Sequence, residues 1–90
     1  MLYFKDFKLY KYESDTGYIV LFINGSEDVV GYLNDIELLY EQNGFNSSAL
    51  FIDVSILKEG KNKIIIIDNI NCETTELYLE VVINDKNSIC

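Results

Sequence analysis

The residues best placed to do chemistry in this chain are carboxylates, because histidine is absent. Glu37 and Glu41 stand four residues apart, a spacing that brings two side chains together on one face of a helix. Such a pair could hold Ca²⁺ or Mg²⁺ weakly, but hard cations usually take six or more oxygen ligands from a loop that wraps the ion. No such loop is visible, so a solvated face explains the pair better and no metal site is predicted.

Other catalytic candidates are few. Without histidine the chain lacks the commonest general base and every Ser-His or Cys-His pairing. Its five glycines are all solitary, so it has no Gly-rich phosphate loop. Cys72 stands beside Glu73 in an acidic setting, which does not favour a reactive thiolate. We therefore expect a protein that is not an enzyme and that uses no cofactor.

The triplet Asp15-Thr16-Gly17 resembles the catalytic triplet of aspartic proteases, whose viral members are homodimers of short chains. The resemblance implies two carboxylates that share a proton at a dimer interface. Here Glu13 and Ser14 precede the triplet in place of an apolar strand, and the apolar run YIVLFI follows directly. An exposed turn between two strands explains the triplet better.

Charge is distributed unevenly along the 90 residues. The seven basic residues are all lysines, and none lies between residues 12 and 57. That segment holds eight acids, which account for the entire net charge of −8: Glu13, Asp15, Glu27, Asp28, Asp35, Glu37, Glu41 and Asp53. Clustered Lys and Arg supply most of the affinity of nucleic-acid-binding proteins, so direct binding of nucleic acid is not expected.

Residues 26–44 can be tested against the helix and strand templates. At 100° per residue, most of their apolar side chains fall within one arc of about 120°, as expected of an amphipathic helix. Ser26 suits an N-cap, and Gly44 suits the residue just past a C-terminus. The pattern predicts a helix over about residues 27–43, with the carboxylates on its outer side.

Two features complicate the predicted helix. Gly31 costs up to about 1 kcal/mol against Ala inside a helix. Asn34 followed by Glu37 resembles a capping box, which leaves open a helix that begins only at Asp35.

The rest of the chain predicts strands. Residues 2–12 and the apolar run 18–23 are typical of a hairpin whose lysine-bearing first strand is an edge and whose second strand is central. Alternating apolar residues predict strands at 50–56 and 76–83, and the run 63–69 suits a buried strand. We therefore expect one α+β domain over residues 1–90, ordered ββαβββ, in which a helix packs on an antiparallel sheet. Residues 85–90 are expected to form a flexible tail.

The stretch FIDVSILKEGKNKIIII resembles a strand-turn-strand of the β-sandwich sugar-binding domains of large glycosidases, which share a Leu-Lys-x-Gly-x-Asn-x-Ile run. It covers about a fifth of the chain. The resemblance implies an all-β sandwich as the alternative fold, and a carbohydrate-binding or structural, oligomeric module as the alternative function.

In size and acidity, and in its lack of catalytic residues, the chain is similar to small phage-encoded inhibitors of defence enzymes, such as anti-CRISPR proteins. The similarity implies a binding module that occludes a basic nucleic-acid-binding groove of a partner protein. The partner-binding residues would be Glu27, Asp28, Asp35, Glu37 and Glu41, with Asp15 and Asp53 as contributors. A solvated surface without a partner explains the same charge run and remains open.

The sequence also bears on cellular location and on oligomeric state. No apolar run approaches the ~18 residues that span a bilayer, and the first residues lack the layout of a signal peptide. We expect a cytoplasmic protein that does not enter the membrane, with free thiols at Cys72 and Cys90. A homodimer is possible, because apolar strand edges can pair between chains.

Overall fold

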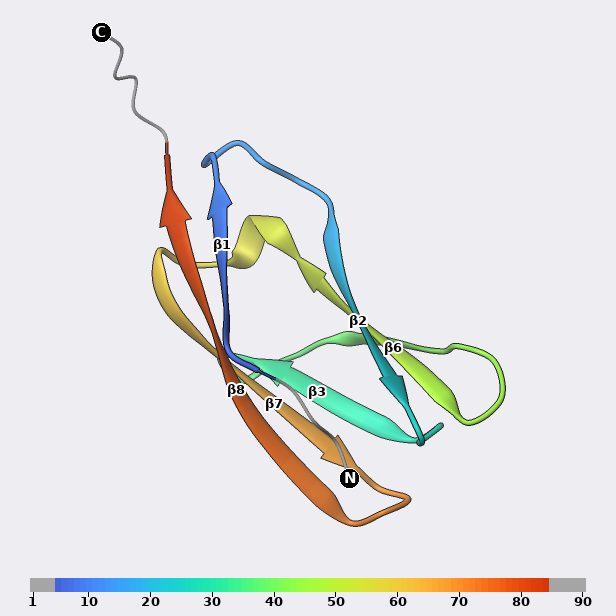
Figure 1. Cartoon of the computed structure of the whole chain (residues 1–90). Helices are drawn as coiled ribbons and strands as arrows, with labels where there is room; N and C mark the ends of the chain where they lie inside the picture. Colours follow the sequence, from blue (N-terminus) through green and yellow to red (C-terminus); the bar gives the residue numbers. More distant parts are fainter. Residues whose placement is uncertain (1–4, 85–90) are drawn as a thin grey trace, which may run out of the picture.

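The computed structural model describes residues 5–84 and consists almost entirely of β-strands in two sheets (Figure 1). Its elements are β1 (Phe7–Lys11), β2 (Tyr18–Asn24), β3 (Val29–Leu33), β4 (Ile36–Glu37), β5 (Leu39–Gln42), β6 (Ser47–Asp53), the 3₁₀ turn η1 (Val54–Ile56), β7 (Gly60–Asp68) and β8 (Glu73–Ile83). One sheet has five strands in the order β1-β8-β7-β3-β4, and the other has three in the order β2-β6-β5. Within residues 5–84, no helix is long and apolar enough to cross a bilayer.

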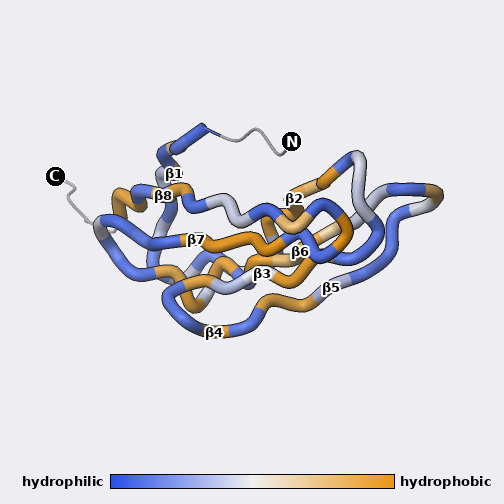
Figure 2. The backbone as a smooth tube through the Cα atoms, turned by 90° about the horizontal axis from the view of Figure 1, so that it is seen from below, coloured by the Kyte–Doolittle hydropathy of each residue, from blue (hydrophilic) through white to orange (hydrophobic). Residues whose placement is uncertain are grey.

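The two sheets share one apolar core. Ile64 and Ile66 of β7 and Leu50 and Ile52 of β6 are all fully buried in it. Figure 2 shows the apolar stretches of β3, β6 and β7 running through the middle of the molecule, with polar turns toward its ends. Each sheet therefore buries one face against the other, the arrangement of a β-sandwich.

The helix predicted over about residues 27–43 is wrong, and so is the α+β fold with order ββαβββ. This segment forms β3 and β4 in the five-stranded sheet and then β5 in the three-stranded sheet. The two sheets agree with the alternative fold, an all-β sandwich.

A tight turn explains why the strand pattern was hidden. Asn34 and Asp35 both have positive φ, 48° and 71°, and they join β3 to β4 as a two-residue hairpin turn. Because Leu33 pairs with Ile36 across the turn, these two residues share a face although they are three positions apart. The two-residue alternation of a single strand is therefore interrupted within the segment. The resemblance of Asn34 and Glu37 to a capping box came from this turn.

Gly31 belongs to the buried face of β3, together with Val29 and Leu33. A Cβ on Gly31 would lie 2.7 Å from Cδ1 of Leu50, which is closer than side chains pack. The glycine therefore allows β3 to approach β6 across the core, although it carries no hydrophobic signal in the sequence.

The strands outside this segment were predicted with mixed success. Leu50 and Ile52 of β6 and Leu77 and Leu79 of β8 are buried, as their alternation indicated. The predicted hairpin of the first two strands is wrong: β1 pairs in parallel with β8, whereas β2 pairs with β6 at an edge of the other sheet. The expected tail at 85–90 lies outside the described residues.

Asn62 organises the turn that the glycosidase-like run encodes. Its Oδ1 accepts hydrogen bonds from the backbone N–H of Lys58 at 3.0 Å and from Nδ2 of Asn34 at 2.9 Å. Its own Nδ2 donates to the carbonyl oxygens of Lys58 at 2.8 Å and Leu79 at 3.2 Å. The side chain is fully buried. The Gly-x-Asn part of the run thus has a structural role that requires no ligand.

A second buried polar group, the Asp68 carboxylate at the end of β7, ties the two sheets together. It accepts hydrogen bonds from Oγ of Ser26 at 2.6 Å, from Nδ2 of Asn71 at 2.7 Å and from the N–H of Ile70 at 3.0 Å. Oγ of Ser48 in β6 donates to the Ser26 carbonyl at 2.7 Å. Burial raises the pKa of Asp68, but these hydrogen bonds outweigh it and the net pKa is lowered.

Gly31→Ala should destabilise the protein by about 1 to 3 kcal/mol, because the new methyl group overpacks the site against Leu50. A helix would predict the opposite sign, since Ala replaces Gly in a helix with a gain of up to about 1 kcal/mol. Urea unfolding followed by circular dichroism measures the change. As a control, Leu50→Ala should relieve the clash, so the double variant should lose less stability than the sum of the two single variants.

Asp68→Asn should lower stability at neutral pH by about 1 to 3 kcal/mol, because the new amide N–H₂ faces the amide donor of Asn71. The carboxylate's folded pKa is lowered, so its contribution is complete above the unfolded value near 3.8 and is lost as pH falls through the folded value. Wild-type stability should therefore fall more steeply than that of Asp68→Asn below pH 3.8. Parallel acid limbs in urea titrations of the two proteins would contradict this role.

Candidate functional site

Asp15 and Cys72, the residues considered for catalysis, lie in two different turns. Oδ2 of Asp15 accepts a hydrogen bond from the backbone N–H of Tyr12 at 3.0 Å, which closes the turn after β1. Cys72 is an exposed free thiol in the turn between β7 and β8. Among residues 5–84, no three His, Cys, Asp or Glu side chains lie close enough to hold a metal ion.

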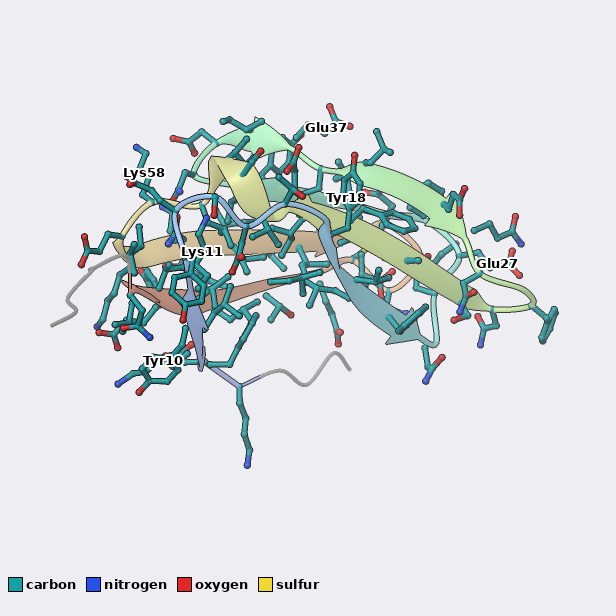
Figure 3. The ribbon with its side chains drawn as sticks, turned by 90° about the horizontal axis from the view of Figure 1, so that it is seen from above. Tyr10, Lys11, Tyr18, Glu27, Glu37 and Lys58 are labelled. Atoms are coloured by element: carbon teal, nitrogen blue, oxygen red, sulfur yellow. The ribbon has the colours of Figure 1, made fainter. Side chains whose placement is uncertain are left out.

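The seven predicted partner-binding acids do not form one array. Glu27 and Asp28 lie in the loop before β3, where Glu27 Oε2 accepts from Asn46 N–H at 2.6 Å and Asp28 Oδ1 accepts from Asn69 Nδ2 at 3.1 Å. Figure 3 shows Glu27 and Glu37 at separate places on the molecule, Glu37 near Tyr18 and Glu27 toward the far end of the sheet.

The remaining predicted acids are placed as follows. Asp35 is exposed at the tip of the β3–β4 turn, and Asp15 lies in the turn before β2. Glu37 and Asp53 lie close together at one end of the three-stranded sheet, whereas Glu41 lies farther along β5. These three carboxylates flank the outer face of the three-stranded sheet.

That outer face is apolar. Ile19, Leu21 and Ile23 of β2 point into the core, so the alternating residues of the strand point outward. The strand register places the outward residues of β6 and β5 beside them. We call this surface the aromatic face; its residues are Tyr18, Val20 and Phe22 of β2, Phe51 of β6, Leu39 of β5, and Ala49 of β6, which is itself buried.

The aromatic face is unusually exposed for its composition. Leu39 is 67%, Tyr18 61% and Phe22 58% exposed. The rings of Tyr18 and Phe51 meet edge to face, with centroids 6.2 Å apart. A contiguous exposed apolar surface with a polar rim is typical of an interaction site.

A shallow depression of about 180 Å³ lies at one end of the aromatic face. Its lining includes Tyr18, Leu39 and Phe51, with the carboxylates of Glu37 and Asp53 at its border. Pockets for drug-sized ligands usually measure about 300 to 1,000 Å³. The size of the depression therefore fits a side chain of a partner better than a whole ligand.

The rim of the aromatic face is anionic. Ser55 donates to the Asp53 carboxylate from its hydroxyl at 2.7 Å and from its N–H at 3.0 Å, and these bonds, with the nearby charge of Lys11, lower the pKa of Asp53. Lys11 itself is buried, and its ammonium donates to the Val54 carbonyl at 3.0 Å. Among residues 5–84, no ammonium group pairs with the exposed Glu37 or Glu41.

The opposite, outer face of the five-stranded sheet differs in charge. Lys8 lies 3.9 Å from Glu80, and the Lys61 ammonium lies 5.8 Å from the ring centroid of Tyr78. The Tyr78 hydroxyl donates to Glu76 at 2.6 Å, and this bond raises the pKa of Tyr78. Cations and anions are interleaved there, so this face lacks the uncompensated charge of the other.

The sequence analysis missed the apolar residues of the aromatic face. Tyr18, Val20 and Phe22 alternate with the core residues of β2, which makes the run apolar on both sides. That signal was assigned to a central strand covered on both faces. An edge strand with one face open to solvent produces the same run.

Comparisons with known proteins leave the site to be judged on its own geometry. No protein-family model, no curated protein and no solved structure matches this chain.

Proposed function

We propose that this protein is a non-enzymatic binding module that recognises another protein through its aromatic face. The observation that carries the proposal is the exposure of Tyr18, Phe22 and Leu39 on one sheet surface. Aromatic residues are enriched at the centres of protein interfaces, where they bury large areas at low cost in conformational entropy.

The rim indicates the chemistry of the partner. Among the described residues, the cation that acts on this rim of Glu37, Glu41 and Asp53 is Lys11, which is buried and donates its hydrogen bond to the Val54 carbonyl. A matching surface would therefore carry an apolar centre with Lys or Arg around it. Attraction between such surfaces speeds their encounter and weakens as salt is added.

Occlusion of a nucleic-acid-binding groove is the narrower form of this proposal. It was argued from a continuous row of carboxylates on one helix, and that helix does not exist. The proposal now rests on the aromatic face and treats the carboxylates as its rim. A Lys- and Arg-lined groove of a phage-targeted defence enzyme would still meet this chemistry, and competition with nucleic acid for the captured partner tests it.

Carbohydrate binding is the second candidate. It is favoured by the position of Tyr18 beside the carboxylates of Glu37 and Asp53, since an aromatic ring can stack on a sugar while carboxylates accept its hydroxyl hydrogens. Binding to a glycan array that persists at high salt and is lost in Tyr18→Ala would favour this candidate over a protein partner.

Action in the cytoplasm belongs to the same proposal. The exposed free thiol of Cys72 is compatible with a reducing compartment. Fractionation of cells that express the chain tests the location.

A photo-crosslinking residue at position 39 should capture the partner, whereas the same residue at position 65, on the opposite sheet face, should not. With the captured protein purified, Leu39→Ser should weaken binding about fivefold or more, as expected when a central contact is truncated. Glu37→Lys should also weaken binding, and the loss of affinity should be larger at low salt than at high salt. Isothermal titration calorimetry measures both.

Glu59→Lys is the matched control, because it makes the same charge change in the turn before β7, away from the aromatic face. It should bind like the wild type. Equal crosslinking from positions 39 and 65, or wild-type affinity in Leu39→Ser, would contradict the proposal.

A further inference from the structure

We propose that two copies of this chain pair through the free edge of β2, so that their three-stranded sheets join into one six-stranded sheet. The inference rests on the backbone of β2 and on its lack of charge. It does not depend on the partner proposed for the aromatic face.

The hydrogen-bond pattern shows which backbone groups of β2 are unpaired. Gly25 N–H donates to Asn46 O at 2.8 Å, and Val54 N–H donates to Gly17 O at 2.9 Å, at the two ends of the β2–β6 ladder. In an antiparallel pair the bonded residues alternate, so the odd-numbered residues of β2 bond to β6. The N–H and C=O groups of Tyr18, Val20, Phe22 and Asn24 therefore point away from β6, toward an edge where the described part of the chain provides no strand.

The other three sheet edges are protected, whereas that of β2 is not. β1 carries Lys8 and Lys11, β4 has only two residues, and β5 carries Glu41. Charges and short length are the usual means by which edges avoid pairing. The seven residues of β2, YIVLFIN, include no charged residue and no proline. An edge of this kind pairs readily with another strand.

The sequence of β2 is also complementary to itself. Antiparallel pairing of two copies about Leu21 sets Val20 opposite Phe22 on the aromatic face and Ile19 opposite Ile23 on the core face. Tyr18 then lies opposite Asn24. The free backbone N–H and C=O groups of residues 18, 20, 22 and 24 in one strand bond to the same groups of the other strand. The contact uses the same surface on both chains, as a two-fold dimer requires.

Repulsion between two chains of net charge −8 does not prevent this arrangement. The nearest strand with a rim carboxylate is β6, which carries Asp53. Two β6 strands would lie three strand spacings apart, about 14 Å, whereas charges are screened over about 8 Å at physiological salt. The residues that pair, 18–24, are uncharged, and Asp15 before β2 and Glu27 after it lie beyond them.

Sedimentation velocity of the full chain tests the proposal. The wild type should sediment as a dimer that dissociates on dilution. Val20→Pro removes an N–H that points to the free edge and leaves the β2–β6 bonds intact, so it should sediment as a monomer. Val20→Thr keeps that N–H and should remain a dimer. Glu37→Lys should also remain a dimer, because β4 is not part of the contact, so a failure of partner binding is distinguishable from a failure of pairing.

Hydrogen exchange of the wild type provides a second measurement that does not depend on the folding of a variant. The amides of Tyr18, Val20, Phe22 and Asn24 should be protected at high protein concentration and should lose protection on dilution. A wild-type chain that is monomeric up to hundreds of micromolar, or one whose four amides exchange rapidly at every concentration, would overturn the proposal.

Discussion

The close approach of β3 to β6 across the core is the constraint on which the rest of the structure depends. Gly31 leaves no room for a side chain beneath Leu50, and the two strands belong to different sheets. Their contact sets the spacing at which the buried residues of both sheets meet, and it fixes the path of the chain on either side. The turn at Asn34–Asp35 then brings β4 back along β3, and the chain crosses to the three-stranded sheet as β5.

The same path explains the candidate site. Because β5 pairs with β6, Leu39 lies beside Phe51 and Glu41 beside Ala49. Had the segment formed a helix on the sheet, its apolar residues would have been buried and its carboxylates gathered outside. In the sandwich the segment contributes both apolar and acidic side chains to the surface, so the aromatic face gains an anionic rim. The fold thus converts an acidic stretch into the border of an apolar surface.

The sequence predicted some of this structure and concealed the rest. The strands that contain Leu50 and Leu77 were predictable because their core residues recur at every second position, Leu50 and Ile52 in one strand and Leu77 and Leu79 in the other. The segment from Val29 to Gln42 was not, because it contains three short strands, a two-residue turn and a change of sheet. Its apolar residues matched a helical arc by coincidence, and Gly31, an inward residue without hydrophobic character, was counted only as a cost to that helix.

For the candidate site, charge was the visible signal and exposure was not. Glu37, Glu41 and Asp53 could be named from the sequence, since the absence of lysine around them is apparent there. That Tyr18 and Leu39 are open to solvent depends on the three-stranded sheet having nothing packed on its outer side among the described residues. Only the assembled fold shows this.

The measurement that tests the account most directly is a nuclear Overhauser spectrum of the isotope-labelled chain. The account predicts cross-peaks between the α-protons of Gly31 and the methyl groups of Leu50, together with strand-like carbon shifts for β3 and β5. Helical carbon shifts through residues 27–43, with contacts between residues three apart and none between Gly31 and Leu50, would contradict it.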